Sequence, residues 1–193
     1  MQEIKVKNII ISKQFEVSEN YKKFLKIVKE KNIKVKVVHA GERIQIEKNL
    51  YIDILWPDIS NPINDNILNN NALVFKLSYI SFSILFTGDI EEIAEKMILE
   101  KYKNNLELLK VDVLKVAHHG SATSSIEEFL NVVRPEIALI GVSEDNSFGH
   151  PSDNVLERLK SFNCKIYRTD KNGEISINVK ANKLLITPFM TDN

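Results

Sequence analysis

The chain has 193 residues, of which 44% are hydrophobic, and it carries 26 basic and 26 acidic side chains. This composition excludes a disordered chain and predicts one folded domain over residues 1–193. The balanced charge excludes a global field that would draw the protein to nucleic acid or anionic lipid. The single Cys164 excludes a disulfide framework and a cysteine-based zinc cage, and no apolar run approaches the ~20 residues of a membrane helix.

The first third of the chain predicts a strand, a helix and a strand. Residues 4–11 read as a strand, and residues 18–31 read as an amphipathic helix with Tyr21, Phe24, Leu25 and Val28 on one face. A strand over 33–38 follows. Residues 1–36 contain ten lysines and four glutamates, an excess that suits either a solvated surface or a local nucleic-acid patch.

The middle of the chain predicts antiparallel strands around a long loop. Residues 43–55 read as a hairpin that closes on Trp56 and Pro57, and the asparagine-rich residues 57–71 read as a loop. Residues 72–79 and 81–88 then read as an antiparallel pair. Loops of this length in compact domains are often functional.

The second half predicts helices that alternate with strands over 111–116, 137–142 and 165–168. The helix after Gly88 and Asp89 places Ile90, Ile93, Ala94, Met97 and Ile98 on its inner face. Ser125 and Glu128 predict a capping box for the next helix. A helix over about 153–162 follows the loop 143–152, and Asn172-Gly173 predicts a hairpin turn before strands at 174–179 and 183–187. The alternation indicates an α/β domain whose central strands are buried on both faces.

Polar side chains follow three of the predicted central strands. Asp89 ends one strand, His118 and His119 end the next, and His150 lies in the loop after the third. Groups at the carboxyl ends of such strands converge on one crevice. Carboxylate and imidazole are the usual ligands of zinc and manganese, and ligands from separate strands and loops are typical of an open catalytic site.

Each of these residues also has a purely structural interpretation. Asp89 suits a helix N-cap with Glu92 completing a box, a histidine at a strand end suits a hydrogen-bonded loop residue, and His150 before Pro151 suits a brace for a turn. The joint pattern favours a shared site. Because successive strand residues face opposite ways, we expect one of the two adjacent histidines to enter it, and we favour His118.

Four segments in this order carry a resemblance to a known family: "FTGDIEEIAEK", "VDVLKVAHHGSATS", "FGHPSDNVLERL" and "YRTDKNGEISI". They resemble the metallo-β-lactamase-fold domain of ComEC-type DNA-uptake proteins, over about residues 4–180. Members normally carry a His-x-His-x-Asp-His loop in their first half, which this sequence lacks, because its only histidines are His39, His118, His119 and His150. The resemblance therefore implies a partial αββα sandwich without its N-terminal strands and that loop.

The resemblance implies a site in which Asp89 bridges two zinc or manganese ions of the complete domain. His118 or His119 completes the metal shell or acts on the leaving group, and His150 is a ligand or proton donor. Ser121 binds a substrate phosphate or orients its neighbour, and Asn70 or Asn71 supports the Asp89 loop or contacts substrate; for these we expect structural roles. The implied chemistry is metal-activated water that attacks a phosphodiester, with DNA as the implied substrate.

Three functions stay open at this point. One is a hydrolase domain that needs the missing half, and another is a binding or partner module that holds no metal by itself. The third is a lactonase or thioesterase-like enzyme of the same fold. We expect a cytoplasmic protein if the chain stands alone and an extracytoplasmic, membrane-tethered one if it is part of a ComEC-like parent. An uncovered sheet edge and core face predict self-association.

Overall fold

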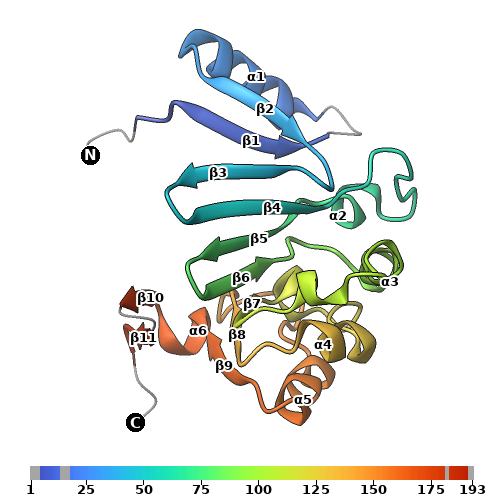
Figure 1. The fold of residues 1–193 in the computed structure, drawn as a ribbon, viewed down its shortest axis with the longest axis vertical. Coiled ribbons are helices and arrows are strands. Elements are labelled where there is room, and N and C mark those ends of the chain that lie inside the picture. Colours follow the sequence, from blue (N-terminus) through green and yellow to red (C-terminus); the bar gives the residue numbers. More distant parts are fainter. Residues whose placement is uncertain (1–4, 14–17, 181–182, 191–193) are drawn as a thin grey trace.

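The computed structural model of the chain describes residues 5–13, 18–180 and 183–190, and Figure 1 shows its elements arranged along one long axis. The N-terminal end holds β1 (Asn8–Ser12), α1 (Glu19–Glu30) and β2 (Lys34–Val38), and the two strands pair in parallel. Ser18 caps α1 by accepting a hydrogen bond from the Tyr21 N–H. The predicted strand–helix–strand order is confirmed there, and residue 4 lies outside the described residues.

A seven-stranded mixed sheet forms the centre of the molecule, and its strands lie in chain order. They are β3 (Arg43–Glu47), β4 (Leu50–Trp56), β5 (Val74–Tyr79), β6 (Phe82–Phe86), β7 (Val113–Lys115), β8 (Ile137–Ile140) and β9 (Lys165–Arg168). The pairs from β3 to β6 are antiparallel, and those from β6 to β9 are parallel. The parallel half therefore directs the carboxyl ends of four strands to one edge.

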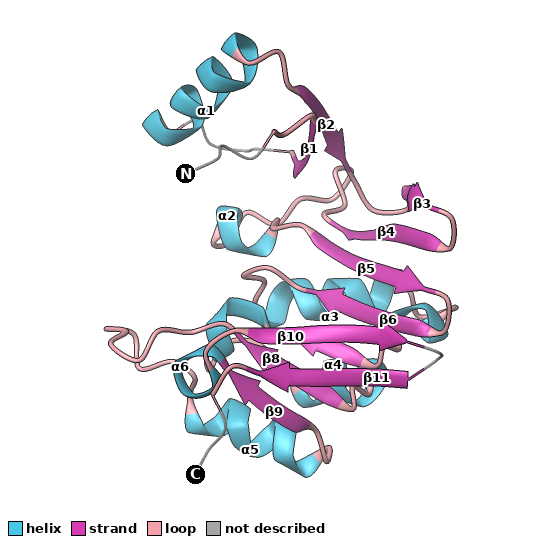
Figure 2. Cartoon of the chain, turned by 90° about the vertical axis from the view of Figure 1, so that its left-hand side faces the viewer, coloured by secondary structure: helices cyan, strands magenta, loops and turns pink. Residues whose placement is uncertain are grey.

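The two faces of the parallel half are covered differently. Helices α3 (Glu92–Lys101), α4 (Glu127–Val133) and α5 (Asp153–Ser161) lie on one face, and the β10 (Ile175–Lys180) and β11 (Lys183–Pro188) hairpin lies across the other (Figure 2). Buried side chains such as Leu85, Leu114 and Phe129 form the core between the sheet and the helices. The predicted α/β class is confirmed, with one large sheet, helices on one face and the β10–β11 hairpin across the other.

Some predicted elements differ from the structure. The loop 57–71 contains a short helix, α2 (Ile67–Asn70), and Ile93 is exposed rather than on the inner face of α3. The predicted hairpin at Asn172-Gly173 is wrong, because α6 (Thr169–Asn172) follows β9 and β10 pairs with β11 instead. A turn motif sets local backbone geometry, and tertiary packing decides which strand becomes the partner.

The predicted capping box of Ser125 and Glu128 is also wrong. Helix α4 begins at Glu127, and the N–H groups of Ser125 and Ile126 donate to the two carboxylate oxygens of Glu95, at 2.6 and 2.8 Å. Glu95 is fully buried on α3, and burial raises its pKa to about 7 against the opposing effect of these two hydrogen bonds. A side chain from another helix thus does what a local cap does elsewhere.

Candidate functional site

The structure brings the four predicted donors to the edge where the parallel strands end. Asp89 lies just beyond β6, His118 and His119 just beyond β7, and His150 in the loop after β8. The Nε2 atom of His119 lies 3.7 Å from Oδ1 of Asp89, and the rings of His118 and His150 are 5.7 Å apart between centroids. The juxtaposition expected from strand order is therefore present.

The two adjacent histidines do not sit on a strand. They belong to a 3-10 turn over Ala117–Gly120, and both have left-handed backbone conformations, with φ of 47° for His118 and 56° for His119. The strand geometry from which we expected only one of them to enter the site is therefore absent, and the preference for His118 stays a prediction. The His118 N–H donates to the Gly88 carbonyl at 3.0 Å, which ties this turn to the turn that carries Asp89.

Gly120 lets the histidine turn approach the His150 loop. Its φ is +83°, and a Cβ there would lie 2.6 Å from the Cβ of Pro151. The Gly120 carbonyl accepts a hydrogen bond from the Ser152 N–H at 2.9 Å. The glycine is required both by the backbone conformation and by this close contact.

The ring of His119 is fixed by a backbone carbonyl. Its Nδ1 lies 2.6 Å from the Gly141 oxygen, which can only accept, so Nδ1 carries the hydrogen. In the neutral ring, Nε2 then has its lone pair free on the side of Asp89. The side chain of His119 is 52% exposed and remains open to a ligand or a proton donor.

His150 is held by the loop that carries it. The Asn146 side chain accepts from the His150 N–H and donates to the His150 carbonyl, each at 2.8 Å. Phe148, which is 80% exposed, stacks on the His150 ring, and a cavity of about 200 Å³ opens beside Phe148 and His119. Burial, with smaller effects of His118 and His119, lowers the pKa of His150.

The predicted polar supports divide into two groups. Asn70 accepts a hydrogen bond from the Glu91 N–H at 3.0 Å, so it supports the segment after Asp89 as expected. Asn71 is 2% exposed, and its amide bonds only to the backbone of Ile63 and Ile67. Its geometry is that of a brace for the 57–71 loop.

Ser121 lies under the histidine turn and is 7% exposed. Its hydroxyl pairs with that of Thr123 at 3.1 Å, and Thr123 donates in turn to Oε1 of Glu91 at 3.2 Å. These contacts suit an orienting role. A role in substrate binding stays a prediction.

Two charged residues at the site, Glu91 and Lys115, were not predicted from the sequence. Glu91 occupies the N-cap position of α3 without capping it, and its Oε1 lies 3.5 Å from Nδ1 of His118. The alternative of Asp89 as the N-cap is thereby wrong. Lys115 donates to the Val116 carbonyl at 2.9 Å, and burial lowers its pKa against the opposing charge of Asp89. In the sequence, Glu91 closes the tripeptide after "TG" and Lys115 directly precedes "VAHHG", and these positions beside the predicted donors could have pointed to both residues.

The arrangement of the donors decides whether the described residues can hold a metal ion. Among the residues that the structure describes, no three His, Cys, Asp or Glu side chains gather closely enough to hold an ion. Asp89 and His119 form one close pair, and His118 and His150 form another. The described residues therefore do not fit a complete metal site on their own.

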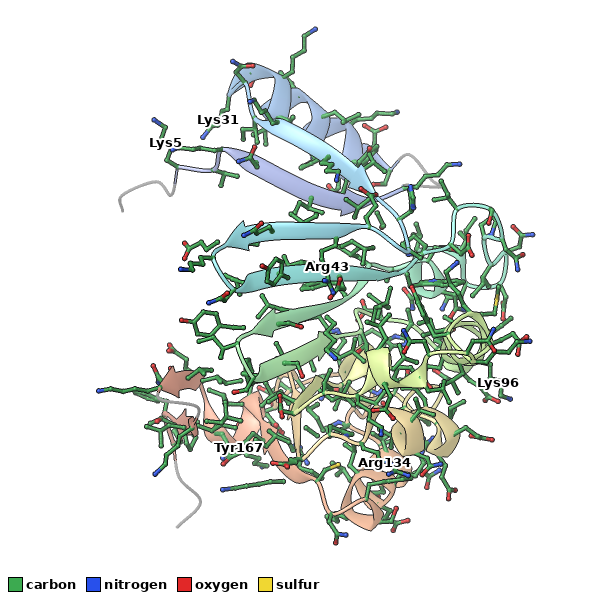
Figure 3. All side chains as sticks on the ribbon, viewed as in Figure 1. Lys5, Lys31, Arg43, Lys96, Arg134 and Tyr167 are labelled. Carbon is green, nitrogen blue, oxygen red and sulfur yellow. The ribbon has the colours of Figure 1, made fainter. Side chains whose placement is uncertain are left out.

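Lysines of the basic N-terminal segment lie at one end of the molecule. Figure 3 shows Lys5 and Lys31 at the end of the molecule that carries β1 and α1, and Lys96 and Arg134 in the half that holds α3 and α4. No described helix is both long enough and apolar enough to cross a membrane.

Comparison with known proteins gives four significant curated relatives, and no family model matches the chain. ComE operon protein 3 of Bacillus subtilis is 34% identical over 91% of this chain and 22% of its own length. Competence protein ComA of Neisseria gonorrhoeae is 32% identical over 78% of the chain and 22% of its own length. Recombination protein 2 of Haemophilus influenzae is 33% identical over 64% of the chain and 15% of its own length.

The chain thus spans about a fifth of the length of the curated relatives it matches. Among solved structures, a Parabacteroides distasonis protein assigned as a metal-dependent hydrolase is 17% identical, with a TM-score of 0.49 over 84% of this chain and 64% of that one.

Proposed function

Because this chain is homologous to a segment of the ComEC-type competence proteins, we propose that it supplies part of a metal-dependent hydrolase site that cleaves phosphodiesters during DNA uptake. The observation that carries the proposal is the convergence of Asp89, His118, His119 and His150 at the carboxyl edge of the parallel strands. The remaining ligands come from outside the described residues. Two divalent ions, zinc or manganese, would supply Lewis-acid chemistry in the completed site.

The residues of this chain have distinct roles in the proposal. Asp89 contributes an anionic oxygen, and His119, with its Nδ1–H held by Gly141, presents Nε2 beside it. His118 or His119 is the ligand, and His150 approaches from the opposite loop as ligand or proton donor. The lowered pKa of His150 keeps its ring neutral over more of the physiological range, which favours the role of ligand over that of proton donor.

A binding or partner module is the second candidate. It is favoured by the absence of any three-donor cluster among the described residues. In that role the four donors hold no metal, and the chain contributes surface alone. A lactonase or thioesterase-like activity differs from the main proposal only in substrate, so a panel of phosphodiester, lactone and thioester substrates separates the two.

The partners follow from the same reasoning. Nucleic acid is the proposed polyanion for the lysine-rich residues 1–36, and residence in a membrane-tethered parent or alone in the cytoplasm stays a prediction.

The antiparallel half of the sheet ends at β3, an edge strand on which Ile46 is 47% exposed. Self-association through such an edge is expected, and light scattering measures it.

Complementation tests the hydrolase proposal. The chain is assayed alone and after fusion to a segment of a ComEC-type protein that carries the His-x-His-x-Asp-His loop. The substrates are bis-p-nitrophenyl phosphate and a labelled DNA oligonucleotide, each with Mn²⁺ or Zn²⁺. We expect no cleavage by the chain alone and cleavage by the joined protein that Asp89→Asn abolishes. A folded, metal-loaded joined protein without activity overturns the hydrolase in favour of the binding module, and full activity of the chain alone overturns the incomplete site.

A further inference from the structure

One ring nitrogen at the candidate site is buried without a hydrogen bond. Nδ1 of His118 is the single buried side-chain nitrogen or oxygen without a partner in the part of the chain that the structure describes. Leaving such an atom unpaired costs about 1–3 kcal/mol. A feature of this kind calls for a specific compensating group nearby.

The nearest charged group is the carboxylate of Glu91. Its Oε1 atom lies 3.5 Å from Nδ1 of His118, too far for a well-formed hydrogen bond but within the reach of an ion pair. Both side chains are largely shielded, with 24% of His118 and 19% of Glu91 exposed. Hydrogen bonds at catalytic sites are often long before the site is complete and shorten afterwards.

The Glu91 carboxylate is itself held in place by neutral donors. Its Oε2 accepts from the amides of Asn66 at 3.1 Å and Asn70 at 3.3 Å, and its Oε1 accepts from the Thr123 hydroxyl. The Glu91 N–H donates to Asn70 as well. A side chain fixed at both ends in this way can orient a neighbouring ring.

We propose that Glu91 is a positioning residue that holds His118 in the Nδ1–H tautomer and so keeps its Nε2 lone pair available to the site. A carboxylate can only accept, so the ring nitrogen that faces it must carry the hydrogen. Nε2 of His118 is not among the buried unpartnered atoms, so it stays on the accessible side of the ring. The role of this tautomer in presenting a metal ligand rests on the proposed function. The tautomer itself depends on neither metal nor catalysis.

His119 and His118 then share one arrangement by different means. A backbone carbonyl fixes Nδ1–H of His119, and a side-chain carboxylate fixes Nδ1–H of His118. Both rings would present Nε2 outward. A side-chain substitution can remove the Glu91 carboxylate that faces His118, but it leaves the backbone carbonyl that faces His119 in place.

The variant Glu91→Gln tests the proposal because it keeps the shape and changes one acceptor into a donor. The Gln amide nitrogen cannot occupy the Oε2 position, where Asn66 and Asn70 both donate. It therefore takes the Oε1 position, where the Thr123 hydroxyl can turn to accept, and it donates to Nδ1 of His118. We expect His118 to switch from the Nδ1–H to the Nε2–H tautomer.

The measurement is long-range ¹⁵N–¹H NMR on histidine-labelled, full-length chain in EDTA, at a pH where the rings are neutral. His119 is an internal reference that keeps Nδ1–H, and Glu92→Gln, at the exposed neighbour paired with Lys96, is the control that changes neither ring. If Glu91→Gln disturbs both rings, the local fold is lost and Glu91→Asp replaces it, with a weakened Nδ1–H preference expected.

An Nε2–H tautomer of His118 in the wild-type chain overturns the proposal, as does an unchanged His118 tautomer in a folded Glu91→Gln variant. Because the sample contains no metal, these outcomes do not depend on hydrolysis. Failure of the complementation assay with a correct tautomer would instead remove the proposed function and leave the positioning of His118 intact.

Discussion

Replacing the buried Glu95 with alanine tests how the loop beside the histidines is held. The Glu95 carboxylate accepts the N–H groups of Ser125 and Ile126, and its side chain is fully buried between α3 and α4. Glu95→Ala leaves two buried donors without an acceptor, at about 1–3 kcal/mol each, so we expect a loss of about 2–6 kcal/mol in the free energy of unfolding. Glu95→Gln keeps one acceptor and should cost about half as much.

The assay is urea unfolding followed by the fluorescence of Trp56, the single tryptophan, which is 1% exposed in the native state. With a urea m-value of about 2 kcal/mol/M, the alanine variant should unfold at about 1–3 M less urea than the wild type. Glu100→Gln is the control, because Glu100 lies on the same helix, is 72% exposed and pairs only with Lys103 at the surface. It should change the stability by less than about 0.5 kcal/mol. Equal midpoints for Glu95→Ala and Glu100→Gln would refute the reasoning.

Further changes test other parts of the structure. Burial raises the pKa of Glu95 from 4.5 to about 7, so the folded state binds this proton more tightly than the unfolded state does. The stabilisation present below pH 4.5 should therefore be lost as pH rises through about 7. Urea midpoints measured across this pH range should show the loss in the wild type and no such dependence in Glu95→Gln. Gly120→Ala should destabilise the chain by more than Gly149→Ala, since both glycines have positive φ but only the first meets a neighbouring side chain, and thermal unfolding compares the two. Lys23→Gln with Lys29→Gln should weaken DNA binding and lower its salt slope by about 2, whereas unchanged binding in filter assays would remove residues 1–36 as the contact.

The order of elements and the gathering of the donors could be predicted from the sequence. Asp89 and the histidines follow apolar strands, and parallel strands bring such positions to one edge whatever the loops do. Periodicity also placed Ala94 and Ile98 correctly in the core. These features depend on local pattern and general topology, which one sequence contains.

The finer structure of the site could not be predicted. The left-handed turn at His118 and His119 is imposed by contacts with Gly88 and the loop after β8, which lie far away in the chain. The roles of Glu91 and Glu95 likewise come from residues 21 or more positions away, Asn66 and Asn70 for the first and Ser125 for the second. Local propensity cannot reveal an acceptor that another helix provides.

Metal stoichiometry tests the central claim most directly. The purified chain is loaded with Zn²⁺ or Mn²⁺, dialysed against metal-free buffer and analysed by elemental mass spectrometry, with Asp89→Asn as the control. An incomplete site predicts less than one equivalent of tightly held metal and little difference between the two proteins. Near-stoichiometric paired ions, lost on Asp89→Asn, would show that this chain contains the whole site and would contradict the account.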